Sequence, residues 1–240
     1  MTYWIGRIEP SMWFEGAWWE EMLPSDVRLA VLSLGVGRLT PEQLELAHSQ
    51  ILEKVDVLER EGVDVINVGG SPVVTAYGMA GHARLVDEIA ARVSRPFVTA
   101  LQAELEGISA VGARRVAIAS PYPAAQTLRR VGILEEEGFE VVAHDSMNIE
   151  RNRDITTLDP RDVLEQAVRL AEANPSAETI YLPCGSLPVI SIIDELESRT
   201  GLPVVACAQA QLAACLKRID YATPIEGFGR LLRERTPIPA

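Results

Sequence analysis

The sequence has few of the residues that build metal centres or disulfide frameworks. Its 240 residues include three histidines and three cysteines, which are Cys184, Cys207 and Cys215. The cysteines are odd in number and form no CxxC pair, so we expect reduced thiols rather than disulfides or a zinc site. The histidines are scattered along the chain without metal-ligand spacing. We therefore expect no metal.

Long apolar runs and clusters of positive charge are also missing. No apolar stretch approaches the roughly 18 residues of a membrane span, and the first residues lack the layout of a signal peptide. The 22 Lys and Arg are outnumbered by 34 Asp and Glu, which gives a net charge of -12. This balance argues against nucleic acid or an anionic membrane surface as a partner. We expect a cytoplasmic protein that binds any anion through local N–H and hydroxyl groups.

Strand-like and helix-like segments alternate along the whole chain. Short β-branched runs such as 63–68 and 179–182 read as buried parallel strands. Amphipathic stretches lie between them, for example 41–61, with Thr40 as its N-cap, and 160–174. The pattern predicts an α/β protein whose parallel sheets carry helices on both faces.

An internal repeat divides the chain into two similar halves. The segment 63–72, VDVINVGGSP, returns 115 residues later as 178–187, ETIYLPCGSL. Each copy is followed by a helix and a matching strand. Two such halves imply a pseudo-twofold axis and a ligand site in the cleft between them, at the carboxyl ends of the strands. We predict one half from 1–94 with 208–240, another from 95–207, and exchange of strands between them.

Cys184 occupies a prominent place in this repeat, at the end of a buried strand and before an expected helix. A helix N-terminus there would favour its thiolate or bind a carboxylate, whereas the alternative is a small buried core residue. The repeat aligns Cys184 with Gly69, so one wall of the cleft would carry a thiol and the other bare backbone. Cys207 and Cys215 are expected in the core.

The serine and glycine neighbours of these two positions supply hydrogen-bond donors. Gly70, Ser71, Gly185 and Ser186 can offer N–H groups, and the serines add hydroxyls. Such a set suits a carboxylate, or the enediolate that forms when the carbon beside it gains negative charge.

Short motifs in a fixed order resemble those of a known group of enzymes. These are 5–10 (IGRIEP), 40–42 (TPE), 69–71 (GGS), 116–122 (VAIASPY), 184–185 (CG), 201–205 (GLPVV) and 227–231 (GFGRL). Together they are similar to the aspartate/glutamate racemase superfamily, in the branch of arylmalonate decarboxylase and maleate cis-trans isomerase.

The resemblance implies roles for individual residues. Racemases and maleate isomerases of this superfamily carry a cysteine on each wall, whereas Gly69 replaces the first one here, as in arylmalonate decarboxylase. Cys184 would then be the single proton donor. The substrate would be bound by residues at the ends of the strands and in the following loops: Pro10, Ser11, Gly69, Gly70, Ser71, Tyr122, Asn152, Gly185 and Ser186.

The function that this resemblance implies is a cofactor-free decarboxylase of a substituted malonate. Its partner would be a small carboxylate or dicarboxylate, and the chain could be a homo-oligomer. Asn152 matches an asparagine of the isomerases, where the decarboxylase is apolar, so an isomerase-like or racemase-like enzyme is the alternative. A carboxylate-binding protein that has lost one catalytic cysteine is a third. The tryptophan-rich segment 13–19 would line the site or serve packing.

Overall fold

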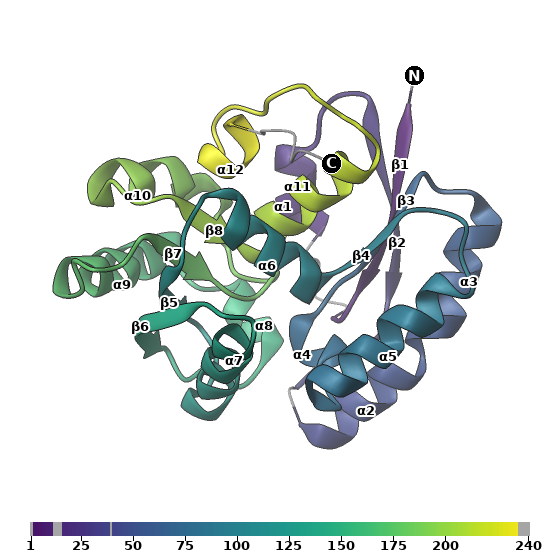
Figure 1. Cartoon of the computed structure of the whole chain (residues 1–240), viewed down its shortest axis with the longest axis horizontal. Coiled ribbons are helices and arrows are strands. Elements are labelled where there is room, and N and C mark those ends of the chain that lie inside the picture. Colours follow the sequence, from purple (N-terminus) through teal and green to yellow (C-terminus); the bar gives the residue numbers. More distant parts are fainter. Residues whose placement is uncertain (1, 12–15, 39, 235–240) are drawn as a thin grey trace.

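The strands that the structure describes form two separate parallel sheets of four, as a computed structural model of the chain shows (Figure 1). The structure describes residues 2–11, 16–38 and 40–234. The first sheet has the order β2-β1-β3-β4 and the second β6-β5-β7-β8. The strands are β1 (Tyr3–Glu9), β2 (Val27–Ser33), β3 (Val65–Val68), β4 (Phe97–Thr99), β5 (Arg115–Ser120), β6 (Glu140–Ser146), β7 (Thr179–Leu182) and β8 (Val204–Ala206). The predicted α/β fold with two parallel-sheet halves is confirmed.

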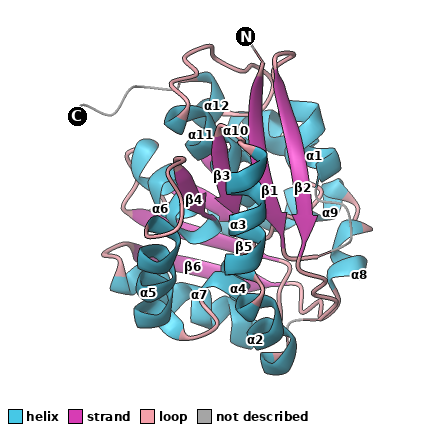
Figure 2. Cartoon of the chain, turned by 90° about the vertical axis from the view of Figure 1, so that its right-hand side faces the viewer, coloured by secondary structure: helices cyan, strands magenta, loops and turns pink. Residues whose placement is uncertain are grey.

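Helices cover both faces of each sheet. They are α1 (Gly16–Met22), α2 (Pro41–Ser49), α3 (Ile51–Glu61), α4 (Ser71–Val74), α5 (Gly78–Ala90), α6 (Ala100–Ala110), α7 (Ala124–Glu136), α8 (Asn152–Thr156), α9 (Pro160–Ala173), α10 (Ile193–Thr200), α11 (Cys207–Arg218) and α12 (Arg230–Arg233), with a 3-10 turn at Ile190–Ile192. In Figure 2 the strands β1 and β2 run vertically while β5 and β6 run across them. None of the described helices is long and apolar enough to cross a membrane.

The two sheets are joined through the paired helices α6 and α11. Helix α6 follows the last strand of the first sheet, and its Ile108 packs with Val116 and Tyr181 of the second. Helix α11 follows the last strand of the second sheet, and its Leu212 packs in one cluster with Val65 of the first. Because each half supplies a helix to the other, the carboxyl ends of both sheets are held together.

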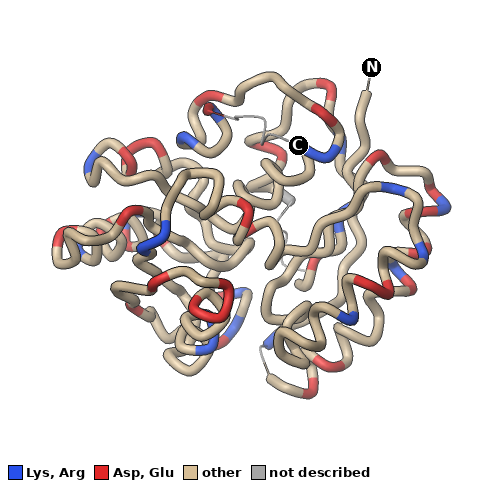
Figure 3. The backbone as a smooth tube through the Cα atoms, in the orientation of Figure 1, with Lys and Arg blue, Asp and Glu red and all other residues tan. Residues whose placement is uncertain are grey.

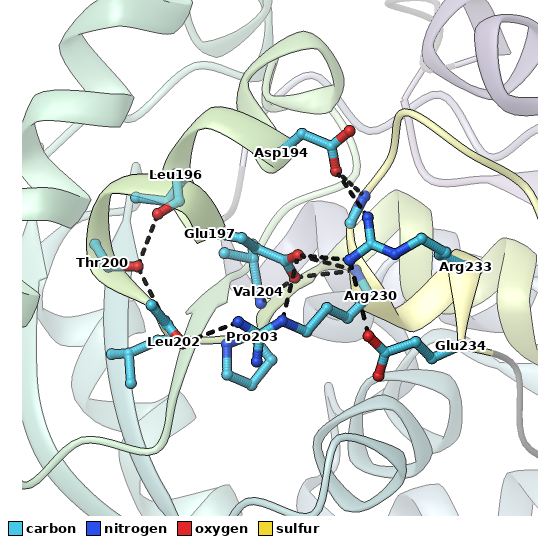
Figure 4. Close-up of polar contacts among 12 residues, drawn as sticks. Asp194, Leu196, Glu197, Thr200, Leu202, Pro203, Val204, Arg230, Arg233 and Glu234 are labelled. Atoms are coloured by element: carbon cyan, nitrogen blue, oxygen red, sulfur yellow. Dashed lines mark hydrogen bonds and ion pairs between the residues drawn. The ribbon is translucent and has the colours of Figure 1, made fainter.

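Strand pairing and the C-terminal contacts refine the predicted halves. β4 pairs with β3, so Phe97–Thr99 lies in the first sheet although the predicted boundary is at residue 94. The C-terminal α12 is attached to the second half through Glu197 of α10, which accepts the N–H groups of Val204 and Arg230 (Figure 4). The division into domains itself stays a prediction.

Three local expectations differ from the structure. The predicted helix 41–61 is two helices, because the N–H of Gln50 bonds to Ala47 three residues back and the first helix ends there. The polar segment 147–160, which its sequence pattern predicts to be a loop, contains the short helix α8. No helix begins at Cys184, and the next α-helix starts at Ile193. A turn and Pro188 lie between them, and a proline disfavours helical backbone at the residue before it.

The tryptophan-rich segment lies partly outside the described residues, which omit 12–15. Trp19 is fully buried in the core, with the Arg7 guanidinium 4.3 Å from the centre of its ring. This part of the segment therefore serves packing and stabilises a buried cation.

Candidate active site

Both sheets present the carboxyl ends of their strands to a single cavity, whose open space is about 350 Å³ including the solvent at its mouth. It is lined by Pro10, Gly70, Ser71, Pro72, Val73, Tyr122, Asn152, Cys184, Gly185, Ser186 and Cys207. Eight of the ten predicted site residues are among them. The other two, Gly69 and Ser11, lie beside the cavity without lining it.

Cys184 stands in an unusual backbone conformation at one wall. Its φ is +91°, and the other described non-glycine residues at positive φ are Asn148 and Asp220, types that tolerate it. A cysteine in this region costs on the order of 1–3 kcal/mol, and such strain clusters at functional sites. The side chain is 7% exposed, so the thiol is shielded but reachable from the cavity.

Strand register corrects the partner of Cys184 in the repeat. The pairing of β3 with β4 and of β7 with β8 relates Val68 to Leu182. Two residues further on, Gly70 matches Cys184, and Gly70 has a similar φ of +82°. Gly69, the partner predicted from sequence, instead donates its N–H to the carbonyl of Ile8 at 2.8 Å. The glycine across the cavity is therefore Gly70.

Gly70 has little room for a side chain, and its positive φ also favours glycine. A Cβ built there would lie 2.7 Å from the Cβ of Pro10, itself a cavity residue.

We expect Gly70→Ala to lower the free energy of unfolding by about 1–3 kcal/mol, because alanine is strained at this φ. Urea unfolding measures it, with Gly132→Ala as the control. Nothing lies within 4 Å of a Cβ at Gly132 in helix α7, so alanine should stabilise there. Equal effects at both positions would contradict the assigned backbone strain.

Tyr122 contributes a hydroxyl at the carboxyl end of β5. Burial raises its pKa well above the usual value, and the thiols of Cys184 and Cys207 add to the shift. The phenol therefore stays protonated at neutral pH and can donate a hydrogen bond to an anion. Its interaction with Cys184 places it next to the thiol.

Ser71 is held by a buried ion pair behind the cavity wall. Its hydroxyl donates to Glu104 Oε1 at 2.6 Å, and Glu104 Oε2 lies 3.4 Å from Arg130 Nη1. Since this hydroxyl hydrogen is committed to Glu104, Ser71 offers the cavity its backbone N–H. Within the described residues, the N–H groups of Ser71 and Gly185 have no protein acceptor.

Asn152 reaches the cavity from the first residue of α8. It is 5% exposed, and its Nδ2 donates to the carbonyl of Val36 at 3.4 Å. The side chain thus connects the two halves, and a second N–H on Nδ2 and the carbonyl oxygen remain for other partners. Asn152 is not the helix cap, which is Arg151.

Cys207 is a cavity residue that sequence reasoning assigned to the core. It is the first residue of α11, because β8 ends one residue earlier. Gln211 donates through Nε2 to its sulfur at 3.1 Å and accepts from Arg7 Nη1 at 3.2 Å. The sequence did hold one sign that Cys207 could reach the cavity, because the residue directly follows the end of a short strand. Cys215 is in the core as predicted, and burial raises its pKa to about 12.

The site offers thiols, hydroxyls and N–H groups, which are donors for an anion. Among the described residues, no group of three or more His, Cys, Asp or Glu could hold a metal ion. Lys and Arg are spread over many elements and alternate with acidic residues (Figure 3). The arrangement is that of a two-lobed α/β protein whose cavity places donors suited to a small anion beside a thiol.

Comparisons with known proteins agree with this class. The family model described as arylmalonate decarboxylase matches residues 18–232, so the chain belongs to that family. Arylmalonate decarboxylase of Bordetella bronchiseptica is 28% identical over 210 residues, which cover 87% of this chain and 88% of the relative. Maleate isomerase of Nocardia farcinica is 26% identical, with 84% and 82% covered.

A solved structure gives the same relationship. A liganded arylmalonate decarboxylase variant, with one glycine changed to cysteine and one cysteine to serine, superposes with a TM-score of 0.91. It is 27% identical, and the match covers 97% of this chain and all of that one. The relatives are thus enzymes of two activities, decarboxylase and isomerase, that share this fold.

Proposed function

We propose that this protein decarboxylates a substituted malonate without a cofactor. The observation that carries the proposal is the asymmetry of the cavity, with the Cys184 thiol on one wall and Gly70 at the equivalent place on the other. One thiol can protonate a planar carbanion from one face, whereas two-base racemisation requires an acid on each face.

The reaction breaks the bond between the central carbon and one carboxylate. Carbon dioxide leaves, and its bonding electron pair stays as an enediolate on the remaining carboxylate. The N–H groups of Ser71 and Gly185 and the Tyr122 hydroxyl would stabilise the enediolate oxygens. Cys184 gives its proton to the carbon, and its thiolate regains a proton from water. When the central carbon carries two different substituents, protonation from a single side predicts one enantiomer of the product.

A maleate-isomerase-like activity is the second candidate, and two observations favour it. Asn152 adds an amide to the cavity that could hold a second carboxylate rather than expel it. Cys207 adds a second thiol to the same cavity. The third candidate is a protein that binds a carboxylate but, having lost one catalytic cysteine, no longer converts it.

Incubation with phenylmalonate and, separately, with maleate discriminates the candidates. We expect CO2 from phenylmalonate and no fumarate from maleate, with an excess of one enantiomer when the substrate carries a methyl group on its central carbon. Fumarate without CO2 would assign the isomerase instead. If either acid binds and no product forms, the protein is the carboxylate-binding candidate.

A further inference from the structure

A second, smaller cavity adjoins the first and contains an unusual arginine. It shares Pro72 and Tyr122 with the main cavity and continues along α7 past Gln126, Arg129, Arg130 and Ile133. Its open space is about 240 Å³ including the solvent at its mouth. Since Tyr122 and Pro72 line both, the second cavity is a direct neighbour of the space beside Cys184.

Arg130 is buried there with its hydrogen bonds incomplete. The residue is 4% exposed, and within the described chain its Nε and Nη1 have no hydrogen-bond partner. Its ion pair with Glu104 is long, at 3.4 Å. A guanidinium carries five N–H donors that match a carboxylate in a fork, and buried donors without acceptors are costly. The side chain is therefore held by one long ion pair and keeps hydrogen-bonding capacity that Glu104 does not use.

The charged residues that line the second cavity are both positive, and Glu104, the acidic partner of Arg130, lies outside this lining. Two of the cavity's seven lining residues are arginines and none is acidic, in a chain of net charge -12. Arg129 is turned toward the backbone, since its Nη2 donates to the carbonyls of Thr75 and Ala76. Arg130, held by the long ion pair to Glu104, is thus the arginine left for a ligand.

We propose that this cavity is an anion subsite in which Arg130 binds an acidic group on the substrate's side chain. This inference rests on the proposed function, because it places the reacting carboxylates beside Cys184. The substrate class becomes a malonate whose substituent ends in a carboxylate. Arg130 takes this carboxylate, and the phenol of Tyr122 lies between the two ends of the substrate.

The test compares two malonates of similar size, one with a 2-carboxyethyl substituent and one with a propyl substituent. We expect wild-type kcat/KM to favour the carboxyethyl compound at least tenfold. The double variant Arg130→Met/Glu104→Gln removes both charges and keeps an amide oxygen for the Ser71 hydroxyl. In it, the preference should fall at least tenfold. The matched control Arg92→Met/Asp56→Asn removes an exposed ion pair and should keep the preference.

Calorimetry with glutarate and butyrate separates this inference from the proposed reaction. Tighter binding of glutarate by at least tenfold, lost in the double variant, supports the subsite even when neither malonate releases CO2. Equal rates for both malonates overturn the subsite and leave the decarboxylase intact. A wild-type protein that binds glutarate no better than butyrate overturns the subsite whether or not the variant folds.

Discussion

Replacing Cys184 by serine is expected to lower kcat/KM for phenylmalonate by about 100- to 10,000-fold, the range of general acid catalysis. Serine keeps the size and the backbone conformation close to those of cysteine, but its hydroxyl is a far weaker acid than a thiol. The release of CO2, followed in single-turnover and steady-state assays, measures the loss. Binding of phenylacetate, the product acid, should persist because the N–H groups and Tyr122 remain.

Two further thiols provide matched controls for this variant. Cys207→Ser changes the other cavity thiol and should alter kcat/KM by less than about tenfold, since Cys184 is the proposed acid. Cys215→Ala changes a core thiol away from the cavity and should preserve the rate in whatever protein remains folded. If Cys207→Ser were as damaging as Cys184→Ser, the assignment of a single proton donor would be wrong.

The largest loss of stability is expected from Arg7→Met, which removes a cation from the centre of the first half. Arg7 is fully buried and donates to Glu9 at 3.1 Å, to Asn67 at 2.7 Å and to Gln211 at 3.2 Å. Methionine would leave the buried Glu9 carboxylate without this partner. Breaking a buried pair from one side costs about 3–5 kcal/mol. Urea unfolding followed by circular dichroism measures the change.

A double variant and a surface variant show whether the uncompensated charge is the cause. Arg7→Met/Glu9→Gln removes both charges and should recover part of the stability that the single variant loses. Arg92→Met disrupts an exposed pair with Asp56 and should change the free energy of unfolding by less than about 1 kcal/mol. A loss below about 1 kcal/mol in Arg7→Met would contradict a structural role for this network.

Local patterns in the sequence were sufficient to predict the strands and the repeat. A parallel strand buried on both faces is a continuous apolar run, so 179–182 is predicted with the bounds that β7 has. Cys184 was found because parallel strands place the residues that follow their carboxyl ends at a common edge, whereas Tyr122 was implied by the family resemblance. The same rule located the cavity between the halves.

Other features depend on contacts between residues far apart in the chain, and tertiary structure decided them. The register of β3 against β4 placed Gly70, not Gly69, across from Cys184, because a shift of one residue exchanges the sides to which a strand's residues point. Glu104 and Arg130 look like ordinary charged helix residues in the sequence. Only the fold brings Glu104 of α6 and Arg130 of α7 together behind Ser71.

The sequence by itself determined an α/β chain with two similar halves and a thiol at the end of one central strand. What surrounds that thiol was decided by the fold. Cys207 reaches the cavity because β8 is only three residues long and α11 begins directly after it. The buried arginines reach their partners across separate elements, since a charge is stable in a core only where packing brings an opposite charge or acceptors to it.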